Sequence, residues 1–429
     1  MGRHLWQRIG AILNNDRGAV LVITIFVVAL VTILVLDYHY DAAVEMELAE
    51  HHANDTKAYH LAMAGLNFAK AILASDTNAY DAPNELWYNL ETFGCIAPGD
   101  LMTLAQTFIE SQLKLGADSP EEPPASELAP QACVALKIVD EDRKLPINRI
   151  LDESEIETPW SGIATQLLRV LWEGEESRDL PEDAIGAVMD WIDTGDGSTR
   201  GGGVGGEDDY YQTLEPPYKT PGRKIEVPGE LRMIRFFTCE RLAKLFDGVA
   251  CDQIPNMDLG TNLYFSTFDH DLININTAPP ALLLAMTGNN EICLEDIELK
   301  RNPAADQPQL LVEPFKTEAD MGSLSCLQEG GVPIDLPKLQ TEVRSPNAPP
   351  VPDYQPSQSL SVTSTYFRVE SQAIIDGQVN KKVVAVFRRE PGGIFGNQEG
   401  NQGGNQGGNQ ESDQPDTRER LQMMYFKVE

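Results

Sequence analysis

The chain has 429 residues, with 33 basic and 66 acidic side chains and a formal net charge of −33. A chain of this length is expected to form two or three units, each with its own buried core. So large an excess of negative charge repels phosphate backbones and anionic lipid surfaces, which argues against nucleic acid as a partner.

The first expected element is an apolar helix over residues 19–36, in which Thr24 and Thr32 are the only polar positions and which Asp37 ends. At about 1.5 Å per residue it is about 27 Å long, close to the ~30 Å hydrocarbon core of a bilayer. Basic residues precede it and acidic residues follow it. We therefore expect a single membrane span with a cytoplasmic amino terminus and an exported carboxyl-terminal part.

The three residues Asp16-Arg17-Gly18 come directly before this apolar run. The arrangement resembles a type IV prepilin leader, in which a dedicated peptidase cuts after the glycine on the cytoplasmic side. The resemblance implies a leader over residues 1–18, cleavage between Gly18 and Ala19 by a prepilin peptidase, and methylation of the new amine on Ala19. An uncut signal anchor is the alternative.

Most proteins with such a leader carry a glutamate at the fifth mature position, which is Ile23 in this chain. A carboxylate inside lipid is costly unless it is paired. In the proteins that carry a type IV prepilin leader, this glutamate is taken to neutralise the terminal amine of a neighbouring subunit. A subunit that lacks it fits the tip of a filament, where this pairing is not needed.

After Asp37 the apolar pattern becomes amphipathic, which predicts that one long helix continues to about Ala74 and packs one stripe on a globular domain. Strands are expected at residues 132–140, 363–373 and 381–389, the last two joined by a turn at Asp376-Gly377. The roughly 200 residues between the first and second strands have helical spacing. The predicted class is therefore α+β: a long transmembrane helix on a small antiparallel sheet, with a large all-helical insertion.

The predicted organisation has seven parts. They are a leader (1–18), a transmembrane helix (19–36), the rest of the long helix with the first part of the sheet domain (37–150), a helical insertion with an acidic loop (151–345), the returning strands (346–391), a Gly-Asn-Gln tail expected to be disordered (392–416) and a C-terminal segment (417–429).

Six cysteines, at positions 95, 133, 239, 251, 293 and 326, all follow the apolar helix, and none forms a C-x-x-C pair. An even number in an exported region indicates disulfides rather than zinc. Six cysteines allow about 15 connectivities, and the sequence does not choose among them; pairing between neighbours is one guess.

Several short phrases, in order, resemble pseudopilin K of bacterial type II secretion, the superfamily member that lacks the membrane glutamate. They are residues 140–148 (DEDRKLPIN), 190–193 (DWID), 207–211 (EDDYY), 216–218 (PPY), 230–232 (ELR) and 273–278 (ININTA). Leu145-Pro146-Ile147-Asn148 departs from the family's more usual asparagine-leucine-asparagine run. The resemblance implies a small pilin-type domain that carries the helical insertion.

Acidic residues gather around a glycine-rich turn over residues 201–206. Such a set repels itself unless it is spread in water or gathered by a hard cation, and the family resemblance adds calcium in this region. The spacing is not that of an EF-hand, because Val204 stands where the bidentate glutamate is needed. A solvated loop is the alternative. The predicted calcium ligands are Asp193, Asp196, Glu207, Asp208 and Asp209.

The resemblance implies a minor pseudopilin in the inner membrane, with its bulk in the periplasm. It would join the minor pseudopilins of types I and J at the tip of the pseudopilus, start assembly and support protein export. A minor pilin of a type IV pilus or DNA-uptake machine is the first alternative. A membrane-anchored hydrolase using the acidic cluster is the second, but no catalytic motif supports it and His270 is the only histidine after residue 60. An enzyme is therefore not expected.

Overall fold

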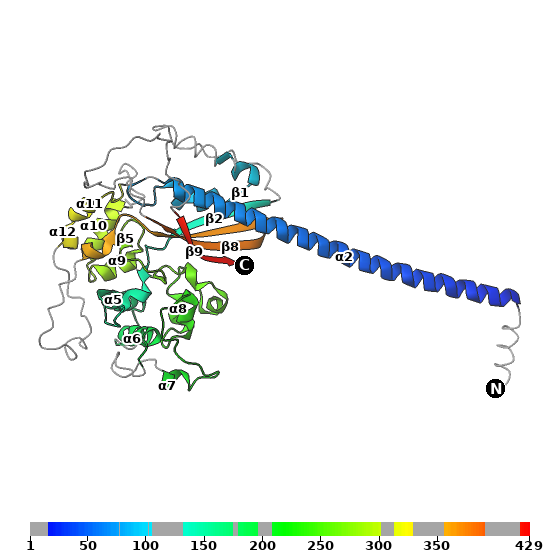
Figure 1. Ribbon diagram of the computed structural model, residues 1–429, viewed down its shortest axis with the longest axis horizontal. Helices are drawn as coiled ribbons and strands as arrows, with labels where there is room; N and C mark the ends of the chain where they lie inside the picture. The colour runs from blue at the N-terminus through cyan, green and yellow to red at the C-terminus, as the bar shows by residue number, and fades with distance from the viewer. Residues whose placement is uncertain are drawn as a thin grey trace, which may run out of the picture.

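A computed structural model of the chain describes residues 16–76, 78–101, 103–104, 132–174, 179–195, 208–301, 313–328, 356–390 and 421–429. Its most extended element is the helix α2, Asp16–Ser75, which projects from the globular part as one rod (Figure 1). At about 1.5 Å per residue the helix is about 90 Å long. It is uninterrupted because the sequence has neither proline nor glycine between Gly18 and Gly65.

Parts of the predicted organisation lie outside the described residues. They include the first fifteen residues of the leader, residues 118–131 of the first part of the sheet domain, residues 346–352 before the returning strands and the Gly-Asn-Gln tail 392–416.

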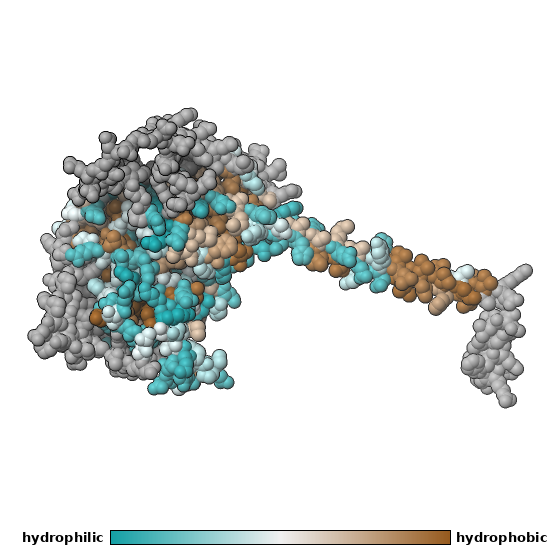
Figure 2. Space-filling model, in the orientation of Figure 1, coloured by the Kyte–Doolittle hydropathy of each residue, from teal (hydrophilic) through white to brown (hydrophobic). Residues whose placement is uncertain are grey.

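The amino-terminal part of α2 has no protein neighbour, and the side chains from Val20 to Leu36 are exposed. In Figure 2 this part has a mostly hydrophobic surface. It belongs to a helix that is long and apolar enough to cross a membrane. This arrangement fits a single-pass membrane anchor.

The carboxyl-terminal part of α2 lies on a five-stranded antiparallel sheet. The strands are β1 (Cys95–Ile96), β2 (Ala132–Asp140), β7 (Tyr366–Ile375), β8 (Gln378–Arg389) and β9 (Leu421–Val428), in the spatial order β1-β2-β7-β8-β9. The predicted end of the helix and the first predicted strand agree with these bounds. The next two observed strands are shifted or extended by up to three residues relative to the predicted ones.

The helix contacts the sheet most closely at Gly65. A Cβ atom there would lie 2.6 Å from Val134 Cγ2 and would also overlap Ser371 Oγ. The Ser371 hydroxyl donates a hydrogen bond to the carbonyl of Ala62 at 2.8 Å, one turn before the glycine. Glycine is therefore required here because the helix backbone lies directly against β2 and β7.

The turn between β7 and β8 has positive φ at both central residues, 52° at Asp376 and 78° at Gly377. Two such residues define a turn whose twist matches that of the flanking strands. The turn predicted from Asp376-Gly377 is thus confirmed. The strand β9 was not predicted; it lies outside β8, and the last residues of the chain form this edge of the sheet.

The residues between β2 and β7 form a unit made mainly of short helices, with a hydrophobic core separate from that between α2 and the sheet. Two pairs of two-residue parallel strands, β3 with β4 and β5 with β6, join segments of this unit that are far apart in the sequence. Its helices and short strands are α5 (Pro159–Leu171), α6 (Leu180–Ile192), α7 (Asp208–Tyr211), α8 (Cys239–Ala243), α9 (Pro280–Met286), α10 (Glu291–Arg301), α11 (Glu318–Gly322), α12 (Ser325–Gln328), β3 (Leu145–Pro146), β4 (Phe265–Ser266), β5 (Ile273–Asn274) and β6 (Leu360–Ser361). The short helix α3 (Leu86–Asn89) belongs instead to the core beneath α2.

Sequence determines where the two longest insertion helices begin. Thr158 precedes α5 and accepts a hydrogen bond from the Trp160 backbone at 3.2 Å, with Pro159 in the first position. The helix α6 has Pro181 in its first turn, followed by Glu182 and Asp183, whose charges favour a helix amino terminus.

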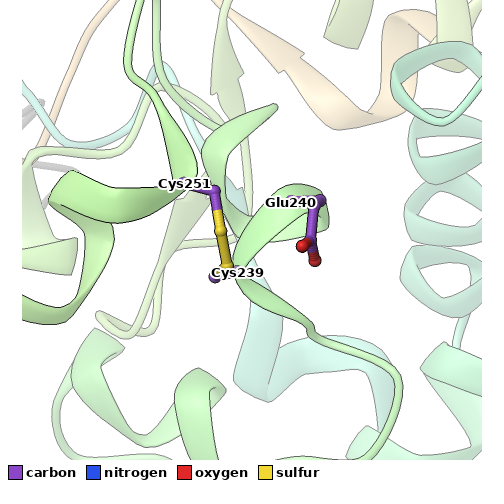
Figure 3. Close-up of side chains that lie close together, drawn as sticks. All are labelled: Cys239, Glu240 and Cys251. Atoms are coloured by element: carbon purple, nitrogen blue, oxygen red, sulfur yellow. A yellow bond between two sulfur atoms is a disulfide. The ribbon is translucent and has the colours of Figure 1, made fainter.

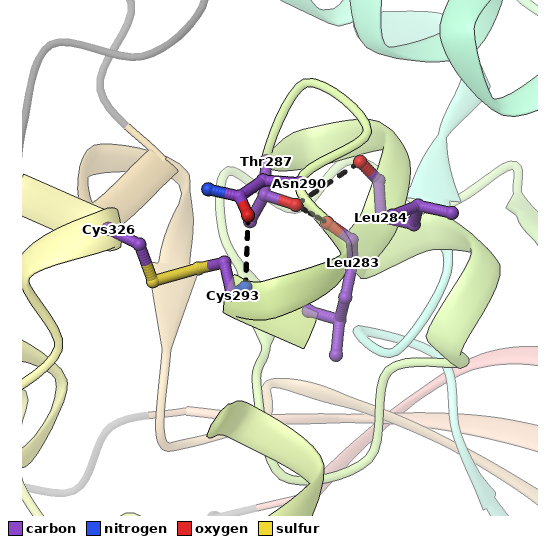
Figure 4. Close-up of a disulfide and its surroundings, with 6 residues drawn as sticks. All are labelled: Leu283, Leu284, Thr287, Asn290, Cys293 and Cys326. Carbon is purple, nitrogen blue, oxygen red and sulfur yellow. Dashed lines mark hydrogen bonds between the residues drawn. A yellow bond between two sulfur atoms is a disulfide. The ribbon is translucent and has the colours of Figure 1, made fainter. Parts of the chain in front are cut away.

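Each cysteine is bonded to its neighbour in the sequence: Cys95 to Cys133, Cys239 to Cys251, and Cys293 to Cys326. The first bond joins β1 to β2, the second joins α8 to the 3-10 helix Cys251–Asn256 (Figure 3), and the third joins α10 to α12 (Figure 4). The connectivity that the sequence left open is therefore pairing between neighbours.

Candidate functional site

The acidic loop begins where α6 ends. Asp193 caps the carboxyl terminus of α6, its backbone N–H donates to the Met189 carbonyl at 2.9 Å, and its side chain is buried. The next residue is held by Glu155, whose carboxylate accepts from the Thr194 backbone N–H at 3.0 Å and from its hydroxyl at 2.7 Å. These hydrogen bonds fix the backbone at Thr194, directly after α6.

Asp208 and Asp209 open α7 on the other side of the loop. Asp208 Oδ1 accepts from the Thr220 backbone N–H at 2.9 Å, and Oδ2 is paired with Lys219 Nζ at 3.0 Å. These donors, Lys219 first, lower the pKa of Asp208 and keep it ionised at neutral pH. Asp209 is exposed.

The segment 220–222 connects the two sides of the loop. Thr220 donates to Asp208, and Gly222, at φ +56°, lies so close to Asp193 that a Cβ atom on it would be 3.3 Å from the Asp193 carbonyl oxygen. The structure thus brings Asp193 and Asp208, two of the five predicted ligands, to the same short segment. Asp196 and Glu207 lie outside the described residues. Within the described part of the chain, no three of the loop's acidic groups converge within 4.8 Å.

Beneath the loop, four of the sequence phrases pack together as one aromatic layer. Trp191 lies edge-on to Tyr211 with ring centroids 5.4 Å apart, and Tyr211 stacks on Tyr218 at 5.0 Å. The Trp191 indole N–H donates to Glu230 Oε2 at 3.3 Å, while Tyr211 Oη accepts from the Arg235 backbone N–H at 3.0 Å. Four phrases that are separate in the sequence therefore lie together in the fold, next to the described ends of the loop at Asp193 and Asp208.

The remaining two phrases meet at the junction between the helical unit and the sheet. Asn274 Nδ2 donates to Asp140 Oδ2 at 3.1 Å, to Ser364 Oγ at 2.8 Å and to the Asp81 carbonyl at 3.0 Å. Asp140 is fully buried, and burial raises its pKa. The sequence interpretation did not identify this network, because its members are far apart in the chain.

Thr277 also belongs to this junction. Its position before α9 predicts an N-cap, but the helix is capped by Pro279, and the Thr277 hydroxyl donates instead to Asp140 Oδ2 at 2.5 Å. The Thr277 hydroxyl is therefore used as a donor to a buried carboxylate rather than as an acceptor at the start of α9. The apolar residues beside it, Ile273, Ile275 and Leu282, are buried, so this segment packs in the core.

A further group of potential ligands, Cys239, Glu240 and Cys251, lies close together, but the two sulfur atoms are joined in a disulfide with the Glu240 carboxylate to one side (Figure 3). A disulfide offers no thiolate to a metal ion, so this group is structural.

The fold and the loop define a class of protein in which one long, partly apolar helix carries a small antiparallel sheet and a large helical unit with an acidic loop. Residues 144–250, which hold the aromatic layer and the loop, match the family model of protein K of the type II secretion system. The resemblance to the minor pseudopilin K is thereby confirmed.

A solved structure similar to this chain is a chain in the crystal structure of the GspK–GspI–GspJ complex of the type 2 secretion system of enterotoxigenic Escherichia coli. The sequences are 12% identical, the TM-score is 0.48, and the alignment covers 90% of this chain and 99% of that chain. No curated protein matches the chain.

Gly18 and Ala19, the predicted processing site, lie in the first turns of α2. Nothing in the fold tests their cleavage, which stays a prediction.

Proposed function

We propose that this protein is the minor pseudopilin at the tip of a type II secretion pseudopilus, where it starts assembly and supports the export of proteins across the outer membrane. The observation that carries the proposal is the protein K match over residues 144–250 in a unit attached to a sheet on a single anchoring helix. Such proteins are structural components, so no catalytic activity is expected.

Ile23 supports a position at the tip. It is exposed on the apolar part of α2, where most filament subunits carry a glutamate. Without that carboxylate the subunit does not neutralise a neighbour's terminal amine. The similar chain comes from a complex of GspK with GspI and GspJ, and we propose minor pseudopilins of these two types as the partners here.

Processing and topology complete the proposal. A prepilin peptidase would cut between Gly18 and Ala19, and the new amine would be methylated. The basic residues before the apolar segment would stay in the cytoplasm, so that the sheet and the helical unit lie in the periplasm.

The decisive experiment is the mass of the amino-terminal peptide of the membrane-extracted protein, with and without the prepilin peptidase. We expect a terminus at Ala19 that depends on the peptidase and is lost in Gly18→Val, with Gly10→Val as the control. A terminus at Met1 in the presence of the peptidase would contradict the proposal. Site-specific crosslinking to the type I and type J proteins then tests the partners.

We also propose calcium in the acidic loop, held by Asp193, Asp196, Glu207, Asp208 and Asp209. Support comes from the segment 220–222, which lies against the Asp193 backbone carbonyl at Gly222 and hydrogen bonds to the Asp208 carboxylate through Thr220. A calcium ion takes six to eight oxygen ligands, which these carboxylates and nearby carbonyls can supply.

The test compares calcium-dependent thermal unfolding of the protein with that of the triple variant Asp193→Asn, Asp208→Asn, Asp209→Asn. A matched control removes the same charge from exposed positions of α10: Glu291→Gln, Glu295→Gln, Asp296→Asn. We expect calcium to raise Tm less in the loop variant than in the control. Equal shifts in the two variants would exclude the loop as a calcium site.

A further inference from the structure

A second set of carboxylates lies far from the acidic loop, at the point where α2 ends. Asp76 directly follows the helix, Asp81 lies in the next turn of chain, and Glu85 precedes α3. Each offers one oxygen, and these oxygens all lie within 4.8 Å of one another. Asp81 and Glu85 are only 1% and 7% exposed.

The charges of this group are not balanced. Its basic partner is Arg389, the last residue of β8, which pairs with Asp76 Oδ2 at 3.1 Å and with Asp81 Oδ2. Among the described residues, one guanidinium faces three carboxylates, which leaves two negative charges when all three are ionised, and burial raises the pKa of Asp81 to about 7 and also raises that of Glu85. Buried charge without compensation is strongly unfavourable.

One oxygen of the group lacks a partner. Asp81 Oδ2 accepts from the Ser364 backbone N–H at 2.7 Å and from Arg389, whereas Asp81 Oδ1 is buried with no hydrogen-bond partner. Buried polar atoms are nearly always satisfied, and an exception calls for an explanation such as a bound ion.

Glu85 is already oriented for ligation. Its Oε2 accepts from the Ala82 backbone N–H and from the Trp87 indole N–H, both at 2.9 Å, and its Oε1 accepts from Asn78. These donors fix the carboxylate in the way that outer partners orient the ligands of metal sites.

We propose that Asp76, Asp81 and Glu85 bind one divalent cation of the calcium class. A doubly charged ion cancels the two unbalanced charges and gives the orphaned Asp81 oxygen a partner. The set contains only oxygen ligands, which suit calcium rather than zinc or copper. The ion joins the end of α2 to the end of β8 through Arg389 and so fixes the long helix to the sheet.

Trp87 makes the proposal directly testable. Its indole contacts Glu85, so a terbium ion in the site would emit light when tryptophan is excited. The experiment uses the full-length protein in detergent with all five proposed loop ligands replaced by their amides, so that the acidic loop carries no carboxylate ligand. We expect terbium emission that added calcium displaces.

Three further substitutions are made in that background. Asp81→Asn should lower the affinity of the site for calcium, measured by its displacement of terbium, at least ~100-fold. The loss of a residue that only hydrogen bonds to a metal ligand already lowers metal affinity about 10–100-fold. Trp87→Phe should abolish the emission but keep a calcium-dependent rise in Tm. Asp100→Asn, at an exposed acidic residue near β1, should change neither.

Emission that is unchanged in Asp81→Asn, or its absence in the folded parent protein, would overturn the proposal. Glu85→Gln repeats the test if Asp81→Asn does not fold, as judged by circular dichroism. Because the loop is already inactivated, failure here leaves the loop calcium and the pseudopilin function untouched.

Discussion

Asn274 and Asp140 are 134 positions apart in the chain and hydrogen bonded at 3.1 Å, which joins the helical unit to the central strand region. Through the same amide group Asn274 also reaches Ser364 and the backbone of Asp81. One amide therefore connects four separate parts of the sequence.

Replacing this amide tests the junction. We expect Asn274→Leu to lower the free energy of unfolding by about 2–4 kcal/mol, because it removes one donor from the buried Asp140 carboxylate and from the Asp81 carbonyl and leaves the buried Asn276 N–H without its acceptor. Urea denaturation followed by tryptophan fluorescence measures the loss. The exposed Asn84→Ala is the control, and a loss no greater than that of the control would show that the network is not required.

The close approach of α2 to the sheet gives a second prediction. Gly65→Val places two methyl groups where Val134 and Ser371 already lie, and we expect a loss of about 3 kcal/mol through overpacking. Ala64→Val, on the exposed side of the same turn, should cost about 0.5 kcal/mol through helix propensity alone. Similar thermal midpoints for the two variants would mean that α2 is not tightly packed against β2 and β7 at this position.

His270 provides a prediction about pH. Its ring is buried, Nδ1 contacts the Leu272 carbonyl at 3.0 Å and Nε2 has no partner. Burial lowers the pKa of His270 from 6.5 to about 4, although Glu141, Asp271 and Asp269 oppose the shift. Between these values the unfolded chain binds a proton that the native protein does not bind, so native stability decreases as the pH falls from about 6.5 to about 4.

We therefore expect the protein to lose about 3 kcal/mol relative to His270→Asn over this pH range. Urea denaturation at several pH values measures the difference in the free energy of unfolding between the two proteins. The titration of the other acids cancels in this difference. His51→Asn, at an exposed position of α2, should run parallel to the unmodified protein. A difference between the protein and His270→Asn that does not change with pH would contradict the prediction.

The disulfides differ in the length of chain that they close. Cys293 and Cys326 are 33 residues apart, and Cys239 and Cys251 are 12 apart. Chain entropy predicts that replacing the first pair by alanine costs about 3–4 kcal/mol and the second about 1 kcal/mol less. Cys293 is fully buried, so removing its sulfur adds a packing loss, whereas its backbone N–H keeps its bond to Asn290 Oδ1 (Figure 4). The thermal midpoints of the two double variants give the order, and the opposite order would refute the entropic argument.

The parts of the fold that depend on neighbouring residues were predictable from the sequence. Continuous apolar and then amphipathic spacing predicted one helix to about Ala74, and α2 ends at Ser75. The strand at 132–140 and the turn at Asp376-Gly377 were also correct, because β-branched runs and positive-φ residues are local signals.

The strand β9 was missed for a physical reason. At the edge of the sheet both of its faces are partly exposed, so Met423, Phe426 and Val428 do not alternate cleanly with polar residues. A bulge opposite Val386 and Phe387 shifts the register further. Its enrichment in aromatic and aliphatic residues was the available signal.

The candidate sites were predictable only in part. The acidic loop is contiguous enough to be noticed, and two of its predicted ligands, Asp193 and Asp208, approach the same segment. The carboxylates at the end of α2 are unremarkable in so acidic a sequence. They become a candidate site only when β8 brings Arg389 beside them.

The sheet order has a consequence for how the chain is made. The strand β2 pairs along its whole length with β7, but the entire helical unit is synthesised between them, and β9 follows both in the chain. The helical unit has its own core and can fold before β2 pairs with β7. Because long-range strand pairing is slow, we expect the sheet beneath the anchoring helix to be completed after the helical unit has folded.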